Sequence, residues 1–138
     1  MLDTNIIIRY ANKNGRLCDK PQRKFFFIVD GIIGQEGWGP MQGDPKRCGV
    51  VIVGANPCII DYVSCKVMGF NPYYLKVVIE PFKKRKKMNH SLVDFSIDEI
   101  KVISNVKDYI NINILSRRES LRFQAPQTWK IIEKSDFF

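Results

Sequence analysis

The chain has 138 residues, 45% of them hydrophobic, and a formal net charge of +8 at pH 7. This length and apolar content predict a single domain, residues 1–138, with its own core. Its apolar runs are shorter than the roughly 20 residues of a membrane span, and its amino terminus lacks the features of a secretory signal, so we expect a cytoplasmic protein that binds no membrane.

The first half of the chain predicts strands separated by a glycine-rich loop. Asn5–Tyr10 is typical of a short strand or the end of a helix. Phe25–Val29 is aromatic and β-branched, which favours a buried strand. Gly31–Lys46 holds five of the nine glycines and two prolines, which predicts a loop. Gly49–Gly54 is a continuous apolar run, typical of a central strand covered on both faces.

A helix is predicted directly after this central strand. Asn56 is a good N-cap, and Pro57 suits the first helical position, where its missing N–H has no partner to lose. Gly69 has the character of a C-cap glycine. Between these ends the apolar residues recur at helical spacing: Ile59, Ile60, Val63, Val67 and Phe70.

The second half of the chain has weaker signals. Leu75–Phe82 is apolar but interrupted by Pro81, and it suits a strand or a helix. Ser96–Glu99 offers a turn or capping signal before a predicted strand at Ile100–Ile103, and Tyr109–Leu115 alternates like a half-exposed strand. Together the elements predict an α/β domain whose sheet is mixed or mainly parallel and has flanking helices.

Three carboxylates fall close to the predicted strand ends. Asp30 ends the first strand, Glu36 lies in the predicted loop, and Asp61 lies in the helix after the next strand. Loops meet above the carboxyl ends of strands in open α/β sheets, so we expect these groups to share one crevice. Such oxygen ligands suit a divalent metal such as Mg²⁺ or Mn²⁺, and in an enzyme one carboxylate would serve as general base.

The same region offers groups for a small anion. Gly37 and Gly39 let backbone N–H groups approach a ligand, and Asn56 and Lys46 are further candidate ligand-binding residues. The glycine spacing misses both the dinucleotide fingerprint and the P-loop. The alternative is structural: the glycines build turns, and the carboxylates cap backbone groups or pair with nearby cations.

The cysteines show no C-x-x-C pair, which predicts buried reduced thiols and no iron-sulfur cluster bound within this chain. A block of cations at Lys83–Lys87 supplies five positive charges. It suits a solvated loop or a helix end, with a polyanion-binding patch as the alternative. Aromatic residues are not interleaved with it, so nucleic acid is not a favoured partner.

Several motifs follow one another between Leu2 and Phe82. They comprise a run from Pro21 to Pro40 that contains Asp30-Gly and Glu36-Gly-Trp-Gly39, then Gly43-x-Pro45-Lys46, then Gly49-Val-Val-Ile-Val-Gly54-x-Asn56-Pro57-x-x-x-Asp61, and finally Met68-Gly69-Phe70. Together they resemble the domain of unknown function 362 family. Members are often longer, and some carry ferredoxin-like iron-sulfur segments. The resemblance therefore implies the carboxyl-terminal portion of a longer protein, with a redox or iron-sulfur partner domain.

Two functional hypotheses follow. The first is a metal or small-anion site under the glycine-rich loop, with Asp30, Glu36 and Asp61 as its catalytic or ligating groups. The second is a non-catalytic binding or scaffold module. A separation of Asp30 from Asp61 too large for a shared ligand would favour the second hypothesis. The sequence indicates neither a substrate nor an oligomeric state.

Overall fold

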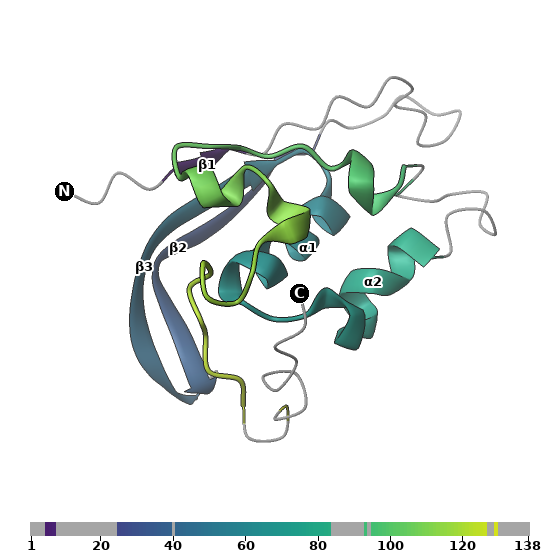
Figure 1. Cartoon of the computed structure of the whole chain (residues 1–138). Coiled ribbons are helices and arrows are strands. Elements are labelled where there is room, and N and C mark those ends of the chain that lie inside the picture. The colour runs from purple at the N-terminus through teal and green to yellow at the C-terminus, as the bar shows by residue number, and fades with distance from the viewer. Residues whose placement is uncertain are drawn as a thin grey trace.

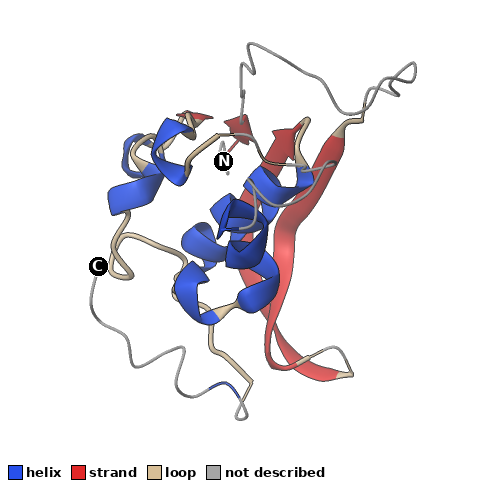
Figure 2. Ribbon diagram, turned by 90° about the vertical axis from the view of Figure 1, so that its right-hand side faces the viewer, coloured by secondary structure: helices blue, strands red, loops and turns tan. Residues whose placement is uncertain are grey.

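A computed structural model of the chain describes residues 5–7, 25–39, 41–83, 93, 95–126 and 129. A sheet forms one layer, and the helices lie together on one side of it (Figure 1, Figure 2). The elements in chain order are β1 (Asn5–Ile7), β2 (Phe27–Trp38), β3 (Gln42–Gly54), α1 (Pro57–Met68), the 3-10 turn η1 (Pro72–Tyr74), α2 (Lys76–Lys83), η2 (Ile97–Glu99), β4 (Ile103–Ser104), η3 (Lys107–Tyr109) and η4 (Ile112–Ile114).

The sheet has the strand order β2-β3-β1-β4. β2 and β3 pair antiparallel, β1 runs parallel to β3, and β4 runs antiparallel to β1. The predicted combination of strands and helices is therefore confirmed. Of the two expected sheet types, the mixed sheet is confirmed. The mainly parallel sheet is wrong, because the long antiparallel hairpin of β2 and β3 supplies most of the strand pairing.

The predicted loop at Gly31–Lys46 is in fact most of this hairpin. Pairing continues from Phe27 opposite Gly54 to Trp38 opposite Gln42. Glycine is a poor strand former, but the ladder satisfies the backbone groups of both strands along this length. The register shifts between Gly31 and Ile33, and opposite this irregularity Gly49 has a φ of 64°. A bulge with a left-handed residue at this point requires glycine.

Helix α1 begins and ends where the sequence predicts. The Asn56 side chain accepts hydrogen bonds from the Cys58 and Ile59 amides, at 2.9 Å and 3.4 Å. At the other end Gly69 has a φ of 89°, and its amide donates to the Lys66 carbonyl. A residue with a side chain is strained at this φ, so glycine ends the helix.

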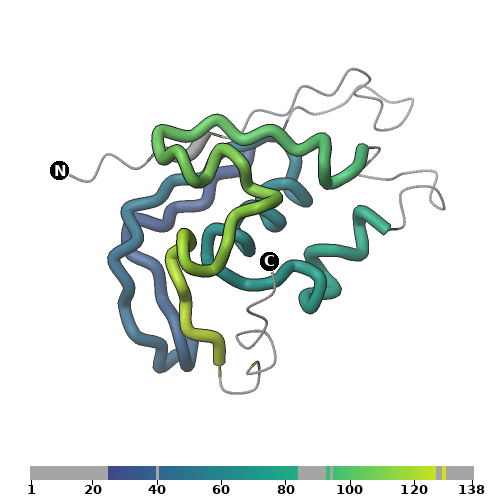
Figure 3. The backbone as a smooth tube through the Cα atoms, in the orientation of Figure 1, coloured from purple at the N-terminus to yellow at the C-terminus, as the bar shows by residue number. Residues whose placement is uncertain are grey.

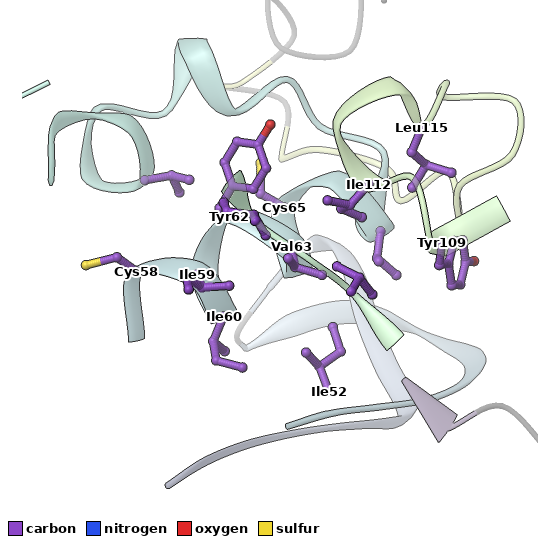
Figure 4. Close-up of a cluster of buried hydrophobic side chains, with 14 of the residues drawn as sticks. Ile52, Cys58, Ile59, Ile60, Tyr62, Val63, Cys65, Tyr109, Ile112 and Leu115 are labelled. Atoms are coloured by element: carbon purple, nitrogen blue, oxygen red, sulfur yellow. The ribbon is translucent and has the colours of Figure 1, made fainter. Parts of the chain in front are cut away.

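The core lies between α1 and the inner face of the sheet. Val63 of α1 is fully buried, and Val50 and Ile52 of β3 are 3% and 2% exposed. Figure 4 shows Ile52 on the sheet below the α1 side chains Ile60 and Val63. Buried residues of the second half of the chain complete the cluster: Val78, Phe82, Val93, Phe95, Ile100, Val102, Tyr109, Ile112, Leu115 and Phe123.

Two predictions for the second half of the chain need correction. The expected strand at Ile100–Ile103 is reduced to Ile103–Ser104, and the expected strand at Tyr109–Leu115 is replaced by η3 and η4. The buried residues there, Tyr109, Ile112 and Leu115, are three positions apart, which matches a 3-10 repeat and not strand alternation.

The remaining signals of the second half have clear outcomes. The ambiguous segment after Leu75 is helix α2, which contains Pro81. The capping signal at Ser96 is confirmed, because its amide donates to the Glu99 carboxylate at 2.7 Å at the start of η2.

Candidate functional site

Asp30 lies within β2, opposite Val51, and not at the end of a strand as expected. Its neighbour Val29 packs against the core, whereas Asp30 itself is exposed. Side chains alternate along a strand, so Asp30 faces away from α1. Its carboxylate accepts a hydrogen bond from the Ile32 amide at 3.1 Å, which satisfies the backbone where the ladder is irregular.

Glu36 faces the opposite side of the hairpin and is already paired. One of its carboxylate oxygens lies 2.8 Å from the Lys46 ammonium group and accepts the Gln124 amide at 2.9 Å. Partial burial by itself raises the pKa of Glu36. The hydrogen bond from Lys46, the bond from Gln124 and the charge of Lys46 outweigh that effect, so the pKa of Glu36 lies below its ordinary value of 4.5.

These contacts attach the carboxyl-terminal part of the described chain to the hairpin. Residues 121–124, here called the strap, run alongside β2 and β3 (Figure 3). The Leu121 and Phe123 amides donate to the Val67 and Met68 carbonyls at the end of α1, at 2.9 Å and 2.8 Å. The Gln124 carbonyl in turn accepts the Gly37 amide at 3.1 Å. The strap therefore joins the end of α1 to the hairpin.

Asp61 lies on α1, on the other side of the sheet from Asp30. It is exposed and makes no hydrogen bond or ion pair with the residues that the structure describes. Partial desolvation raises its pKa above 3.8. The structure therefore does not bring Asp30 and Asp61 into one crevice.

The three carboxylates form no common centre. Across residues 25–39, 41–83, 93, 95–126 and 129, no group of three or more histidine, cysteine, aspartate or glutamate side chains could hold a metal ion. Asp30 faces outward from the sheet, Glu36 pairs with Lys46, and Asp61 lies on the helix. A bound Mg²⁺ or Mn²⁺ ion stays a prediction of the sequence that this arrangement does not support.

The other predicted ligand-binding residues serve the fold. The Gly37 amide donates to Gln124, and Gly39 lies in the turn between β2 and β3. The Asn56 side chain caps α1, and Lys46 pairs with Glu36. Each of these polar contacts is thus with the protein itself, as the structural alternative expects.

Lys66, one of the cations close to Asp61 in the sequence, is buried. It is 2% exposed, and its ammonium group donates to the Leu115 and Asn113 carbonyls at 3.0 Å and 3.4 Å. Desolvation lowers its pKa from 10.5. Its place in the last turn of α1 suits a cation, and its bonds attach the helix to the segment around η4.

The cysteine prediction is confirmed for two residues. Cys58 and Cys65 are buried free thiols, and burial raises the pKa of both, that of Cys65 to about 12. Thiols with raised pKa values are poor nucleophiles. Cys48 is a half-buried free thiol, and Cys18 lies outside the described residues.

The basic block is described only at its first residue. Lys83 is exposed and lies 3.5 Å from Glu80 of the same helix. The remaining residues of the block, 84–87, lie outside the described part of the chain. Polyanion binding by the block stays a prediction of the sequence.

One feature that the sequence did not predict is an exposed apolar surface on the sheet. Three isoleucines of β2, Ile28, Ile32 and Ile33, are 62%, 53% and 66% exposed. Ile103 of β4 lies in the same cross-strand row as Val53 and Ile28, and it is 53% exposed. We call the side of the sheet opposite α1 the outer face. No described helix covers it (Figure 2).

Glu36→Gln is expected to destabilise the fold by about 1 to 2 kcal/mol near neutral pH, because the charge-assisted bond from Lys46 is lost. The pKa of Glu36 is lower in the folded state, so its contribution is complete above pH 4.5 and is lost as the pH falls through the folded value. Denaturant melts of both proteins across this range test it. Asp44→Asn is a matched control, because Asp44 is the exposed cross-strand partner of Glu36.

Asp61→Asn is expected to change the free energy of unfolding by no more than about 0.5 kcal/mol at pH 7, because this carboxylate has no described partner. Its raised folded pKa means that the folded state binds the proton more tightly. The parent protein should therefore gain stability relative to the variant as the pH falls through that value. A loss of about 1 to 3 kcal/mol in denaturant melts would instead reveal a structural partner. Calorimetric titration with Mg²⁺ or Mn²⁺ tests the metal hypothesis separately.

The first part of the chain is similar to one family of domains. The family described as "Domain of unknown function (DUF362)" matches residues 1–66, which confirms the resemblance there. The match is shorter than the predicted extent to Phe82: it lies at the amino-terminal end of the chain and ends within α1. No curated protein and no solved structure matches the chain. None of the helices in the described part is long and apolar enough to cross a membrane.

Proposed function

We propose that this chain, whose residues 1–66 match the domain of unknown function 362 family, is a non-catalytic module that binds another protein. The outer face of the sheet is its binding surface. The observation that carries the proposal is the row of isoleucines on this face, each more than half exposed.

The energetic argument rests on the contrast between the two faces. The inner face of the sheet is covered by α1 and the core cluster, whereas the outer face presents Ile28, Ile32, Ile33 and Ile103 to solvent. Burial of apolar surface is worth roughly 25 cal/mol per Å². Single exposed apolar residues are ordinary, but a contiguous apolar patch indicates an interaction site.

The polar groups support the same conclusion. Of the groups with predicted chemical roles, Glu36 and Lys46 are paired with each other, Asn56 caps a helix, and Asp30 and Asp61 lie on opposite sides of the sheet. This separation is the property that favours a binding module over a shared ligand site. A redox or iron-sulfur domain, which the family resemblance implies as a partner, is one kind of protein that such a face could bind.

Carbene footprinting of the outer face tests the proposal. The protein is labelled in the cells that produce it and, separately, as dilute purified protein. Peptides that contain Ile28, Ile32 and Ile33 should be labelled less in cells than in dilute solution. Tyr73 and Val77, which are exposed in η1 and α2, are the internal control and should be labelled equally. Isoleucines labelled as strongly as Tyr73 and Val77 in both samples would contradict a docking role.

A further inference from the structure

The structure points to a second copy of this chain as the occupant of the outer face. We propose that two copies pack outer face to outer face about a two-fold axis, with Asp30 of each copy paired to Arg47 of the other. This inference rests on the proposed docking function and names its partner.

Asp30 and Arg47 lie on the same face of the hairpin. Asp30 faces outward because Val29 beside it packs against the core. Arg47 is exposed, whereas the residues on either side of it, Lys46 and Cys48, face inward. The Lys46 ammonium group lies 5.3 Å from the centre of the Phe123 ring. The Cys48 sulfur lies on the same side, because a Cβ atom on Gly34 would meet both this sulfur and the Phe123 ring. Alternation along β3 therefore places Arg47 on the outer face.

These two charges have no partner of opposite charge within the described chain. The ion pairs there are Lys46 with Glu36 and Lys83 with Glu80. The Asp30 carboxylate accepts only the Ile32 amide. One carboxylate and one guanidinium thus lie on the same face as the exposed isoleucines, where Gln35 is a further polar residue. A charge in the middle of an apolar interface is tolerated when the partner surface supplies the opposite charge.

The spacing of the two charges suits a two-fold axis. Asp30 lies opposite Val51, and Arg47 lies four positions before Val51 in β3, which corresponds to about 13 Å along the strand. An axis between two packed sheets that crosses the hairpin midway, near Ile32, exchanges the two ends of this segment. It therefore sets Asp30 over Arg47 of the other copy, and Arg47 over Asp30 of the other copy, at the same time.

The charge of the face also favours self-association. The chain as a whole carries +8, so two copies repel each other at most orientations. Among the described strand residues of β2 and β3, the outer face holds one charge of each sign, and its apolar surface includes Ile28, Ile32, Ile33 and Val53. This orientation therefore brings together apolar surface and opposite charges, and it does not bring like charges into contact.

Packing by the face is favoured over pairing along the free edge of β2. β2 is the terminal strand of the sheet, so a further strand could in principle extend the ladder. However, two amides of β2 already donate hydrogen bonds within the chain: the Ile32 amide to the Asp30 side chain, and the Gly37 amide to the Gln124 carbonyl. These contacts and the register shift at Gly31 interrupt the edge, whereas the isoleucines and the two charges remain exposed on the outer face.

Charge-reversal variants test the pairing in solution. Sedimentation equilibrium of the purified chain should show a dimer. The Arg47→Asp substitution should raise the dissociation constant of this dimer at least tenfold. Asp30→Arg should have the same effect. An equimolar mixture of the two variants should regain the dimer, because the carboxylate introduced at position 47 of one variant then faces the guanidinium introduced at position 30 of the other. The control is Arg118→Asp, which makes the same charge change at an exposed position outside the face and should leave the dissociation constant unaltered.

The salt dependence of the dissociation constant is a second test, which is needed if Asp30→Arg does not fold. Asp30→Arg also loses the bond to the Ile32 amide, so its fold is checked by circular dichroism. If this variant does not fold, the effect of salt on the dissociation constant tests the charge pairing instead. The dissociation constant of the parent protein should rise with added salt, and that of Arg47→Gln should rise less.

Two results would overturn the inference. One is a parent protein that stays monomeric at its highest soluble concentration, and the other is a dimer that does not respond to the charges at positions 30 and 47. If the chain is monomeric but the footprint in cells is still protected, the docking function stands and the partner is a different protein. If the footprint is also unprotected, both proposals fail.

Discussion

Phe123→Ala is expected to lower the free energy of unfolding by about 3 to 5 kcal/mol, the usual range for removal of a buried aromatic side chain. Phe123 is 6% exposed, belongs to the core cluster and lies under the ammonium group of Lys46. It also holds the strap against the hairpin. The variant therefore loses apolar burial, leaves a cavity beside Gly34 and weakens the attachment of residues 121–124.

A denaturant melt of the purified variant measures this loss. Tyr73→Ala is the control, because it removes an aromatic ring that is 59% exposed and should cost about 0.5 kcal/mol or less. Similar losses for the two variants would mean that the strap does not pack as described.

Gly34→Ala is the second large effect that we expect, at about 1 to 3 kcal/mol. A Cβ atom on Gly34 would lie 2.8 Å from a ring carbon of Phe123 and 3.1 Å from the sulfur of Cys48. The Phe123 ring occupies the space that a side chain at position 34 needs, so one of the two must move. This contact gives a physical reason for glycine at position 34 that involves no ligand.

A double-mutant cycle isolates this contact. In a Phe123→Leu background the smaller side chain leaves room, so the cost of Gly34→Ala should fall by at least about 0.5 kcal/mol. Gly39→Ala is the matched control, since a Cβ there meets only the end of the Gln35 side chain, at 3.5 Å. Strictly additive losses at positions 34 and 123 would show that the close approach does not limit side-chain size.

The sequence predicted α1 correctly because its signals are local. Asn56, Pro57 and Gly69 act within one helix, through a side-chain cap, a fixed φ and a left-handed φ. Each of these effects is complete within a few residues of chain. The capping contact between Ser96 and Glu99 was predictable for the same reason.

The glycine-rich segment was misread because its structure depends on distant residues. Glycine composition predicts a loop, but pairing between β2 and β3 makes the segment a hairpin. Glu36 and Gln124 are 88 positions apart in the sequence, so no local pattern predicts the contact between them. Tyr109–Leu115 shows the same ambiguity, since spacings of two and of three both place apolar residues on one side of a short segment.

The sequence by itself determined which residues are apolar, which are charged, and where α1 begins and ends, because these properties belong to single residues or to neighbours in the chain. Only the tertiary structure decided that Asp30 and Asp61 lie on opposite sides of the sheet, and that Glu36 bonds to Lys46 and to the strap. It also decided that the described helices cover one face alone. An apolar strand has the same alternation whether or not a second layer covers it, so the bare outer face becomes visible only when the whole chain is folded.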